Sequence, residues 1–163
     1  MENYMKLEIA AISQNEGFAR SAVAAFALGL NPTLSQLSDI KTAVSEAVTN
    51  SVVHAYKRAD ENRKIVIECR TEPTLLGGVL HIRITDFGVG IEDVEKAVTP
   101  FYTTLAGEER SGMGFTIMQT FMDDFSLQSE CGRGTVVRMQ KRIENQAETY
   151  FAEDKEQREE INA

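Results

Sequence analysis

Three short stretches, widely separated along the chain, most constrain what this sequence can fold into. They are residues 46–50 (EAVTN), 86–91 (DFGVGI) and 110–115 (RSGMGF). The first carries Glu46 and Asn50 four residues apart in a strongly helical run, so both side chains leave one helix face a turn apart. The second follows a strand-like run, and the third precedes a helix-like run. A carboxylate, an amide and a helix start in this order indicate a site for a magnesium nucleotide.

Composition limits the classes of protein to which this chain can belong. Its 163 residues suffice for one domain with a substantial core, and 42% hydrophobic with 26% charged residues is ordinary for a soluble protein. The net charge of -8 argues against nucleic acid or an anionic membrane as the main partner. No run is long enough to span a bilayer, and the N-terminus does not resemble a secretory signal, so we expect a cytoplasmic location. Cys69 and Cys131 lack metal-binding spacing, which favours reduced thiols; a disulfide is the alternative.

Hydrophobic periodicity predicts an alternation of strands and helices. Period-two patterns predict strands at residues 6–10, 64–70, 79–85, 125–129 and 135–140, the first perhaps at a sheet edge. Helical patterns predict helices at residues 18–30, 34–56, 91–98 and 112–122. The strands at 64–70 and 79–85 are expected to pair antiparallel, because their connection is too short for a crossover helix. We expect one domain over residues 1–141 and a charged tail, helical or disordered, over residues 142–163.

An aspartate at the end of a strand suits recognition of adenine. Asp86 can accept a hydrogen bond from the exocyclic amino group of the base. Gly88 and Gly90 let the backbone approach a nucleotide and adopt positive φ, and Ile91 completes the stretch. The alternative is a simple turn aspartate, because Asp-x-Gly is common in turns.

Glu46 and Asn50 carry the candidate metal and proton-transfer chemistry. The side-chain carbonyl oxygen of Asn50 is a suitable ligand for Mg²⁺, which prefers oxygen and keeps several waters. Glu46 can take the proton from an attacking hydroxyl. The alternative is a solvated acid–amide pair on the surface of a helix.

The third stretch suits phosphate binding. Backbone N–H groups at a helix start bind phosphate oxygens, and Arg110 can neutralise charge on the terminal phosphate. The residues that offer this helix start are Ser111, Gly112, Met113 and Gly114, followed by Phe115. Residues 99–110 show no clear period, and a loop of this length is often a functional lid.

Two further features concern partners. Arg20 lies near the start of the predicted helix at residues 18–30, where it is either a solvated arginine or a contact to a protein partner. From residue 153 onward nearly every residue is charged, which indicates either a solvated end or a partner-binding segment.

Taken together, the three stretches resemble the nucleotide-binding boxes of the GHKL family, which includes DNA gyrase, the large heat-shock chaperone, histidine kinases and the mismatch-repair ATPase. Longer runs at residues 45–50, 100–104, 109–118 and 121–124 resemble the serine kinases of endospore-forming bacteria that act as anti-sigma factors. The resemblance covers roughly residues 5–140. It implies an α+β fold, a two-layer α/β sandwich of the Bergerat type with a mixed, mainly antiparallel sheet and helices on one face.

The resemblance also implies an activity and its partners. It implies a homodimer that binds a sporulation sigma factor of the sigma-F type and keeps it from RNA polymerase. It further implies that the protein uses Mg-ATP to phosphorylate a serine of a small anti-anti-sigma factor, without direct contact to nucleic acid or membrane. By this resemblance Glu46 is the base, Asn50 the Mg²⁺ ligand and Asp86 the adenine reader.

The resemblance assigns five more residues. It makes Arg110 a phosphate contact and places Thr103 and Thr104 in the lid. Thr135, early in the last strand, resembles the family threonine that supports adenine recognition, and Arg20 lies where partners dock in such proteins. Three alternatives are a sigma-B-type stress-response kinase, a nucleotide-gated binding module without significant catalysis, and a stand-alone ATPase, although the last usually carries a transducer domain that is missing here.

Overall fold

The fold was analysed in a computed structural model, which describes residues 2–56, 63–75, 77–100 and 112–144. Helices and strands follow one another in the order that the sequence predicts. The elements are β1 (Asn3–Ala10), α1 (Gln14–Ala27), the 3₁₀ turn η1 (Leu28–Leu30), α2 (Leu34–Asn50), the π-helical turn η2 (Ser51–Ala55), β2 (Lys64–Thr74), β3 (Gly77–Asp86), α3 (Val94–Ala97), α4 (Gly114–Phe121), β4 (Asp124–Glu130) and β5 (Gly134–Glu144).

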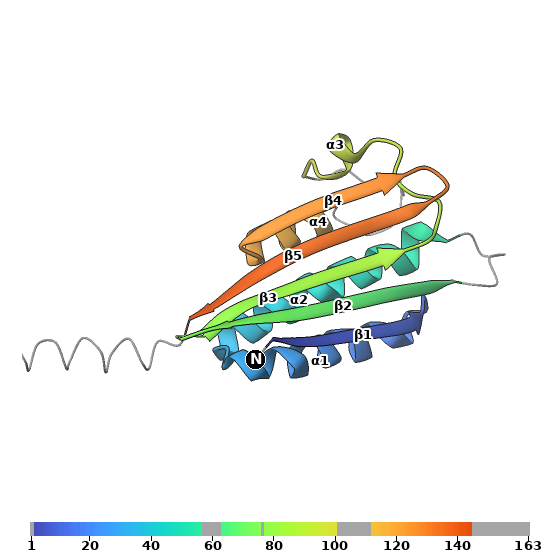
Figure 1. The fold of residues 1–163 in the computed structure, drawn as a ribbon. Helices are drawn as coiled ribbons and strands as arrows, with labels where there is room; N and C mark the ends of the chain where they lie inside the picture. Colours follow the sequence, from blue (N-terminus) through green and yellow to red (C-terminus); the bar gives the residue numbers. More distant parts are fainter. Residues whose placement is uncertain (1, 57–62, 76, 101–111, 145–163) are drawn as a thin grey trace, which may run out of the picture.

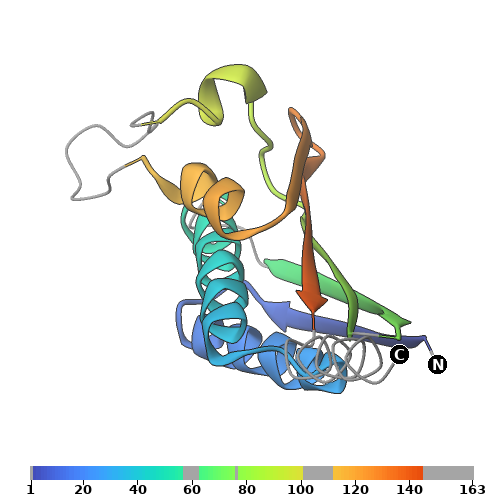
Figure 2. The same cartoon turned by 90° about the vertical axis from the view of Figure 1, so that its left-hand side faces the viewer.

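The strands form one sheet in the order β1-β2-β3-β5-β4, with β1 at an edge as predicted. The predicted antiparallel pairing of β2 with β3 is confirmed, with Ile67 opposite Ile84. All four pairings in the described part are antiparallel, so this part shows none of the parallel pairs that a mixed sheet would contain. The predicted α+β, two-layer architecture is confirmed: α1, α2 and α4 lie on one face of the sheet (Figures 1 and 2).

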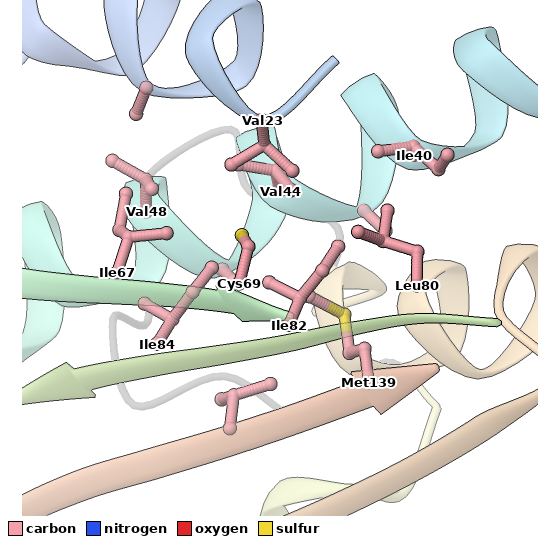
Figure 3. Close-up of a cluster of buried hydrophobic side chains, with 14 of the residues drawn as sticks. Val23, Ile40, Val44, Val48, Ile67, Cys69, Leu80, Ile82, Ile84 and Met139 are labelled. Atoms are coloured by element: carbon pink, nitrogen blue, oxygen red, sulfur yellow. The ribbon is translucent and has the colours of Figure 1, made fainter. Parts of the chain in front are cut away.

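Side-chain alternation explains the two layers. Leu80, Ile82 and Ile84 of β3 are at most 2% exposed, because every second residue of the strand faces the helices. Figure 3 shows these side chains meeting Val44 of α2 and Met139 of β5. Each such side chain contributes about 1.5–3 kcal/mol of burial free energy. This core fixes the rotation of α2 about its axis. It therefore determines which side chains of α2 face the sheet and which point away from it.

Several boundaries differ from the predictions. The predicted helix at residues 34–56 changes after Asn50 into the π-helical turn η2. Strand β5 continues to Glu144, beyond the expected domain end at residue 141, because Ile143 is 1% exposed and pairs with Gly78 of β3. Ile143 therefore belongs to the sheet and not to a tail helix, whereas residues 145–163 lie outside the described residues.

Two remaining predictions concern membranes and thiols. Among the described helices, none is long and apolar enough to cross a bilayer. Cys69 and Cys131 are both free thiols, as predicted. Cys69 lies in the core (Figure 3), where burial raises its pKa to about 12, whereas Cys131 is exposed in the turn between β4 and β5.

Candidate nucleotide-binding site

A cavity of about 1190 Å³ lies between α2 with η2, the segment after β3, α3 and the start of α4. This volume slightly exceeds the usual range for small-molecule sites, roughly 300–1,000 Å³. All three predicted stretches meet here, although they are far apart in sequence. The predicted site residues that line it are Glu46, Asn50, Asp86, Gly90, Ile91, Gly112, Met113, Gly114, Phe115 and Thr135.

The start of α4 lies directly against the acid and amide of α2. A Cβ atom added to Gly114 would be 3.1 Å from Glu46 Oε2 and 3.1 Å from Asn50 Nδ2. Val44 and Val48 on the same helix are fully buried, so the side of α2 that carries Glu46 and Asn50 is turned toward α4. The first and third stretches therefore form one surface, and glycine at position 114 keeps space beside both polar groups.

Asp86 is held rigidly at the other side of the cavity. It is 4% exposed, and its Oδ1 accepts hydrogen bonds from the backbone N–H of Gly88 (3.2 Å) and of Thr135 (3.1 Å). Its Oδ2 accepts a hydrogen bond from the Ser51 hydroxyl at 3.1 Å. Burial raises the pKa of the carboxyl, and these three hydrogen bonds counteract part of that rise. The bond from Gly88 fits a turn aspartate, but burial and two distant donors show an oriented carboxylate.

The glycines after Asp86 allow close backbone packing. A Cβ on Gly88 would lie 1.9 Å from the carbonyl oxygen of Ala55, so Gly88 packs against η2 and does not line the cavity. Gly90 has φ +73°, and a Cβ there would lie 2.2 Å from Glu130 O. The backbone N–H of Val89 also donates to Ala55 O at 2.7 Å. The segment is therefore clamped between η2 and the end of β4, which fixes the wall that it forms.

Thr135 lies in a small hydroxyl network. Ser129 Oγ accepts from Ile91 N at 2.8 Å, donates to Gly134 O at 2.9 Å and lies 2.9 Å from Thr135 Oγ1. Because Ser129 has one hydroxyl hydrogen, donation to Gly134 leaves Thr135 as the donor in their contact. The Thr135 oxygen then keeps acceptor capacity beside the cavity that it lines.

Sequence reasoning missed Ser51 and Tyr56. Ser51 follows Asn50 directly, but only the π-helical turn and the end of β3 bring its hydroxyl to Asp86. The Tyr56 hydroxyl accepts from Phe87 N at 2.9 Å and donates to the carbonyl oxygen of Lys64. Tyr56 thus ties the start of β2 to the residue after Asp86. The only sequence signal for either residue was weak: both follow shortly after the first stretch, residues 46–50.

We expect Tyr56→Phe to lower the free energy of unfolding by about 1–2 kcal/mol, because two backbone groups lose a partner that is partly shielded from water. Urea denaturation would measure this change. Tyr4→Phe is the matched control, since the Tyr4 hydroxyl contacts Glu68 on an exposed surface and its loss should cost at most about 0.5 kcal/mol. Equal effects of the two substitutions would contradict the bridging role of Tyr56.

Sequence reasoning also did not place residues 92–97 at the site. The segment containing α3 lines the cavity, and Lys96 brings a cationic side chain that lies 3.5 Å from Asp93. Four predicted site residues, Thr103, Thr104, Arg110 and Ser111, lie outside the described residues.

Arg20 is separate from the cavity. It lies on α1, its side chain is 47% exposed, and its guanidinium is 3.4 Å from the Glu16 carboxylate one turn earlier. Glu16 also accepts a hydrogen bond from Ser45 of α2 at 2.5 Å. Arg20 is therefore oriented on the outer surface of the helical layer and is not part of the nucleotide pocket.

Comparison with known proteins shows to which family this chain belongs. Residues 10–141 match the family described as the histidine kinase-like ATPase domain. Over 141 residues the chain is 53% identical to an anti-sigma F factor of Caldanaerobacter subterraneus, covering 86% of this chain and 94% of the relative. This chain belongs to the anti-sigma F factor family, within the histidine kinase-like ATPases. Membership of that ATPase family implies that the chain binds ATP.

Other members of the anti-sigma F factor family give the same result. A relative from Clostridium botulinum is 52% identical over 142 residues, covering 87% of this chain and 96% of the relative. One from Clostridium perfringens is 48% identical over 143 residues, covering 88% and 99%. Among solved structures, the mycobacterial sensor histidine kinase MprB matches with a TM-score of 0.48 and 14% identity, covering 88% of this chain and 99% of that chain.

Proposed function

We propose that this chain is an anti-sigma factor and a protein-serine kinase. It binds a sporulation sigma factor of the sigma-F type and uses Mg-ATP to phosphorylate a serine of an anti-anti-sigma factor. It acts in the cytoplasm as a homodimer. The observation that carries the proposal is the contact of the α4 start with Glu46 and Asn50, in the same cavity that holds the buried Asp86.

The two ends of the cavity suit the two ends of ATP. Asp86 is oriented by three donors, so its carboxylate is ready to accept a hydrogen bond from the adenine amino group. Thr135 adds a hydroxyl oxygen beside it. The backbone around Gly112 and Gly114 begins α4, where N–H groups attract phosphate oxygens. Outside the described part, Arg110 and Ser111 belong to the same phosphate-binding stretch, and Thr103 and Thr104 to the lid.

The residues present fit a magnesium ion that arrives with the nucleotide. In the described part of the chain, no cluster of three or more His, Cys, Asp or Glu could hold a metal by itself. Asn50 would supply one side-chain oxygen, and the phosphates and water would supply the rest, as Mg²⁺ usually prefers. The space beside the Asn50 amide exists because residue 114 is glycine. When bound, the ion would neutralise charge on the transferred phosphoryl group.

Glu46 is the proposed general base. It lies on the same face of α2 as Asn50, one turn away, and lines the cavity. The serine hydroxyl of the protein substrate attacks the γ-phosphorus, the bond to the bridging oxygen breaks, and ADP leaves. Glu46 receives the hydroxyl proton, and Arg110 stabilises charge on the terminal phosphate.

The sigma-factor partner is proposed from the relatives and from the surface. The relatives are named anti-sigma F factors, which favours the sigma-F type over a sigma-B-type stress regulator. Arg20 offers an exposed guanidinium on α1, outside the nucleotide cavity. We propose that it contacts a protein partner, so that partner binding and nucleotide binding use different surfaces.

The test is transfer of labelled γ-phosphate from Mg-ATP to the proposed antagonist, a small anti-anti-sigma factor. We expect label on an antagonist serine and co-purification of the sigma factor with the chain. If ATP binds but no antagonist is labelled, the kinase proposal fails and a nucleotide-gated binding module replaces it. Phosphate release at an equal rate without any protein acceptor would instead indicate a stand-alone ATPase.

A further inference from the structure

Three strongly exposed leucines lie in elements that meet at the end of the sheet opposite to the nucleotide cavity. Leu28 of η1 is 54% exposed, Leu34 at the start of α2 is 87% exposed, and Leu75 after β2 is 97% exposed. We call these three residues the leucine patch. Large apolar side chains exposed together on a soluble domain usually mark a surface that something covers.

Contacts between η1, α2 and the strands bring the segments that carry these leucines to one end of the sheet. A Cβ on Gly78 of β3 would lie 2.8 Å from Leu30 Cδ2, so η1 packs directly on the β2–β3 hairpin. The side-chain amide of Gln36 in α2 donates to the carbonyl oxygen of Arg142 in β5 at 3.4 Å. Figure 1 shows the start of α2 beside this end of the hairpin. The elements that carry the three leucines therefore meet near the place where β5 ends.

The chain itself continues from this end of the sheet. Glu144, the last residue of β5, pairs with Gly77, and Gly77 is two residues from Leu75. Residues 145–163 follow, with apolar residues Ala147, Tyr150 and Phe151 at the i, i+3 and i+4 spacing of one helix face. In a helix, Tyr150 would lie about 9 Å from Glu144 along the helix axis.

The comparisons set this segment apart from the shared domain. The family match ends at residue 141. Matches to relatives cover up to 99% of the relative's length but only 88% of this chain. Most of the additional residues of this chain therefore follow the last strand, where the leucine patch lies. The added segment has one apolar face, and the leucine patch near its first residue is also apolar. The two surfaces could therefore cover each other.

We propose that residues 145–163 dock on the leucine patch of their own chain through Ala147, Tyr150 and Phe151. The acidic side chains of the segment, Glu148, Glu153 and Asp154 among them, then face water. The patch then becomes an intramolecular docking site. This proposal does not depend on the proposed kinase or anti-sigma activity.

Because the chain contains no tryptophan, Tyr150→Trp creates a single fluorescent reporter in the full-length protein. We expect a blue-shifted emission and shielding from acrylamide quenching in this variant at every protein concentration. Adding Leu34→Ser and Leu75→Ser should shift the emission to that of free tryptophan and remove the shielding. Both leucines are exposed, so these substitutions should leave the folded domain intact.

Ile12→Ser in the Tyr150→Trp background is the matched control, because Ile12 is 38% exposed but lies just after β1, at the other end of the sheet. It should leave the tryptophan shielded. A solvent-exposed tryptophan in the parent variant would overturn the proposal, as would shielding that persists in the leucine variants. Shielding that grows with protein concentration would also overturn it, because the occupant would then be a second copy of the chain.

Discussion

Glu46→Gln should lower the rate of serine phosphorylation by about 10²–10⁴-fold, the usual contribution of a general base. The substitution keeps the shape of the side chain but removes its ability to accept the hydroxyl proton. Binding of ADP should change little, because we propose that Asp86 on the opposite wall recognises the adenine base. Single-turnover transfer of labelled phosphate and calorimetric titration with ADP would measure the two effects separately.

Glu95→Gln is the control for this experiment. Glu95 also lines the cavity, but it is an exposed residue of α3 and has no proposed part in the reaction. It should leave transfer nearly unchanged. Undiminished transfer by Glu46→Gln would remove Glu46 from the role of base. Equal losses of transfer and of ADP binding would indicate a structural defect instead.

Asp86→Asn should weaken ADP binding on the order of 100-fold, which corresponds to the loss of a charge-assisted hydrogen bond of about 1.5–3 kcal/mol. The introduced amide N–H₂ would point a donor at the adenine amino group, which is itself a donor. Inosine diphosphate carries an acceptor at that position and should lose much less affinity. The ratio of the affinities for ADP and inosine diphosphate therefore tests whether Asp86 recognises the adenine amino group. An equal loss of affinity for both nucleotides would contradict this role.

The stability of the same variant should depend on pH in a defined direction. Burial raises the pKa of Asp86 above its ordinary value of 3.8, so the folded state holds this proton to higher pH than the unfolded state does. Stability from this group therefore falls as pH rises from below 3.8 through the raised pKa, where the folded carboxyl ionises. The unfolding free energy of Asp86→Asn relative to wild type should rise over the same interval. Denaturant unfolding at acidic and neutral pH would measure it.

Asp93→Asn is the matched control for the nucleotide measurement. Asp93 lines the same cavity, but its side chain is 44% exposed and caps the start of α3 by accepting a hydrogen bond from Lys96 N at 2.9 Å. Asparagine is equally suited to that capping position. The control should keep the preference for adenine. A relative stability of Asp86→Asn that is constant with pH would show that Asp86 does not titrate differently in the folded state.

Local patterns in the sequence determined the elements and the polar residues of the site. The spacing of Glu46 and Asn50 already placed both on one helix face, because an α-helix brings residues four apart together. Alternation in residues 79–85 predicted a strand that runs into Asp86, and the structure confirms this strand. The family resemblance also led correctly to the two-layer fold. These results depend on short-range geometry or on shared motifs, which a single sequence contains.

Only the tertiary structure decided how these residues cooperate. Two of the three donors to Asp86 come from Ser51 and Thr135, which are 35 and 49 residues away, and no local pattern connects them. The π-helical turn after Asn50 directs Ser51 toward β3, although periodicity alone predicted a continuing helix. Likewise, Gly114 meets Glu46 and Asn50 only because α4 packs on α2. Contacts of this kind follow from how separate elements bury their apolar faces together, which sequence periodicity does not specify.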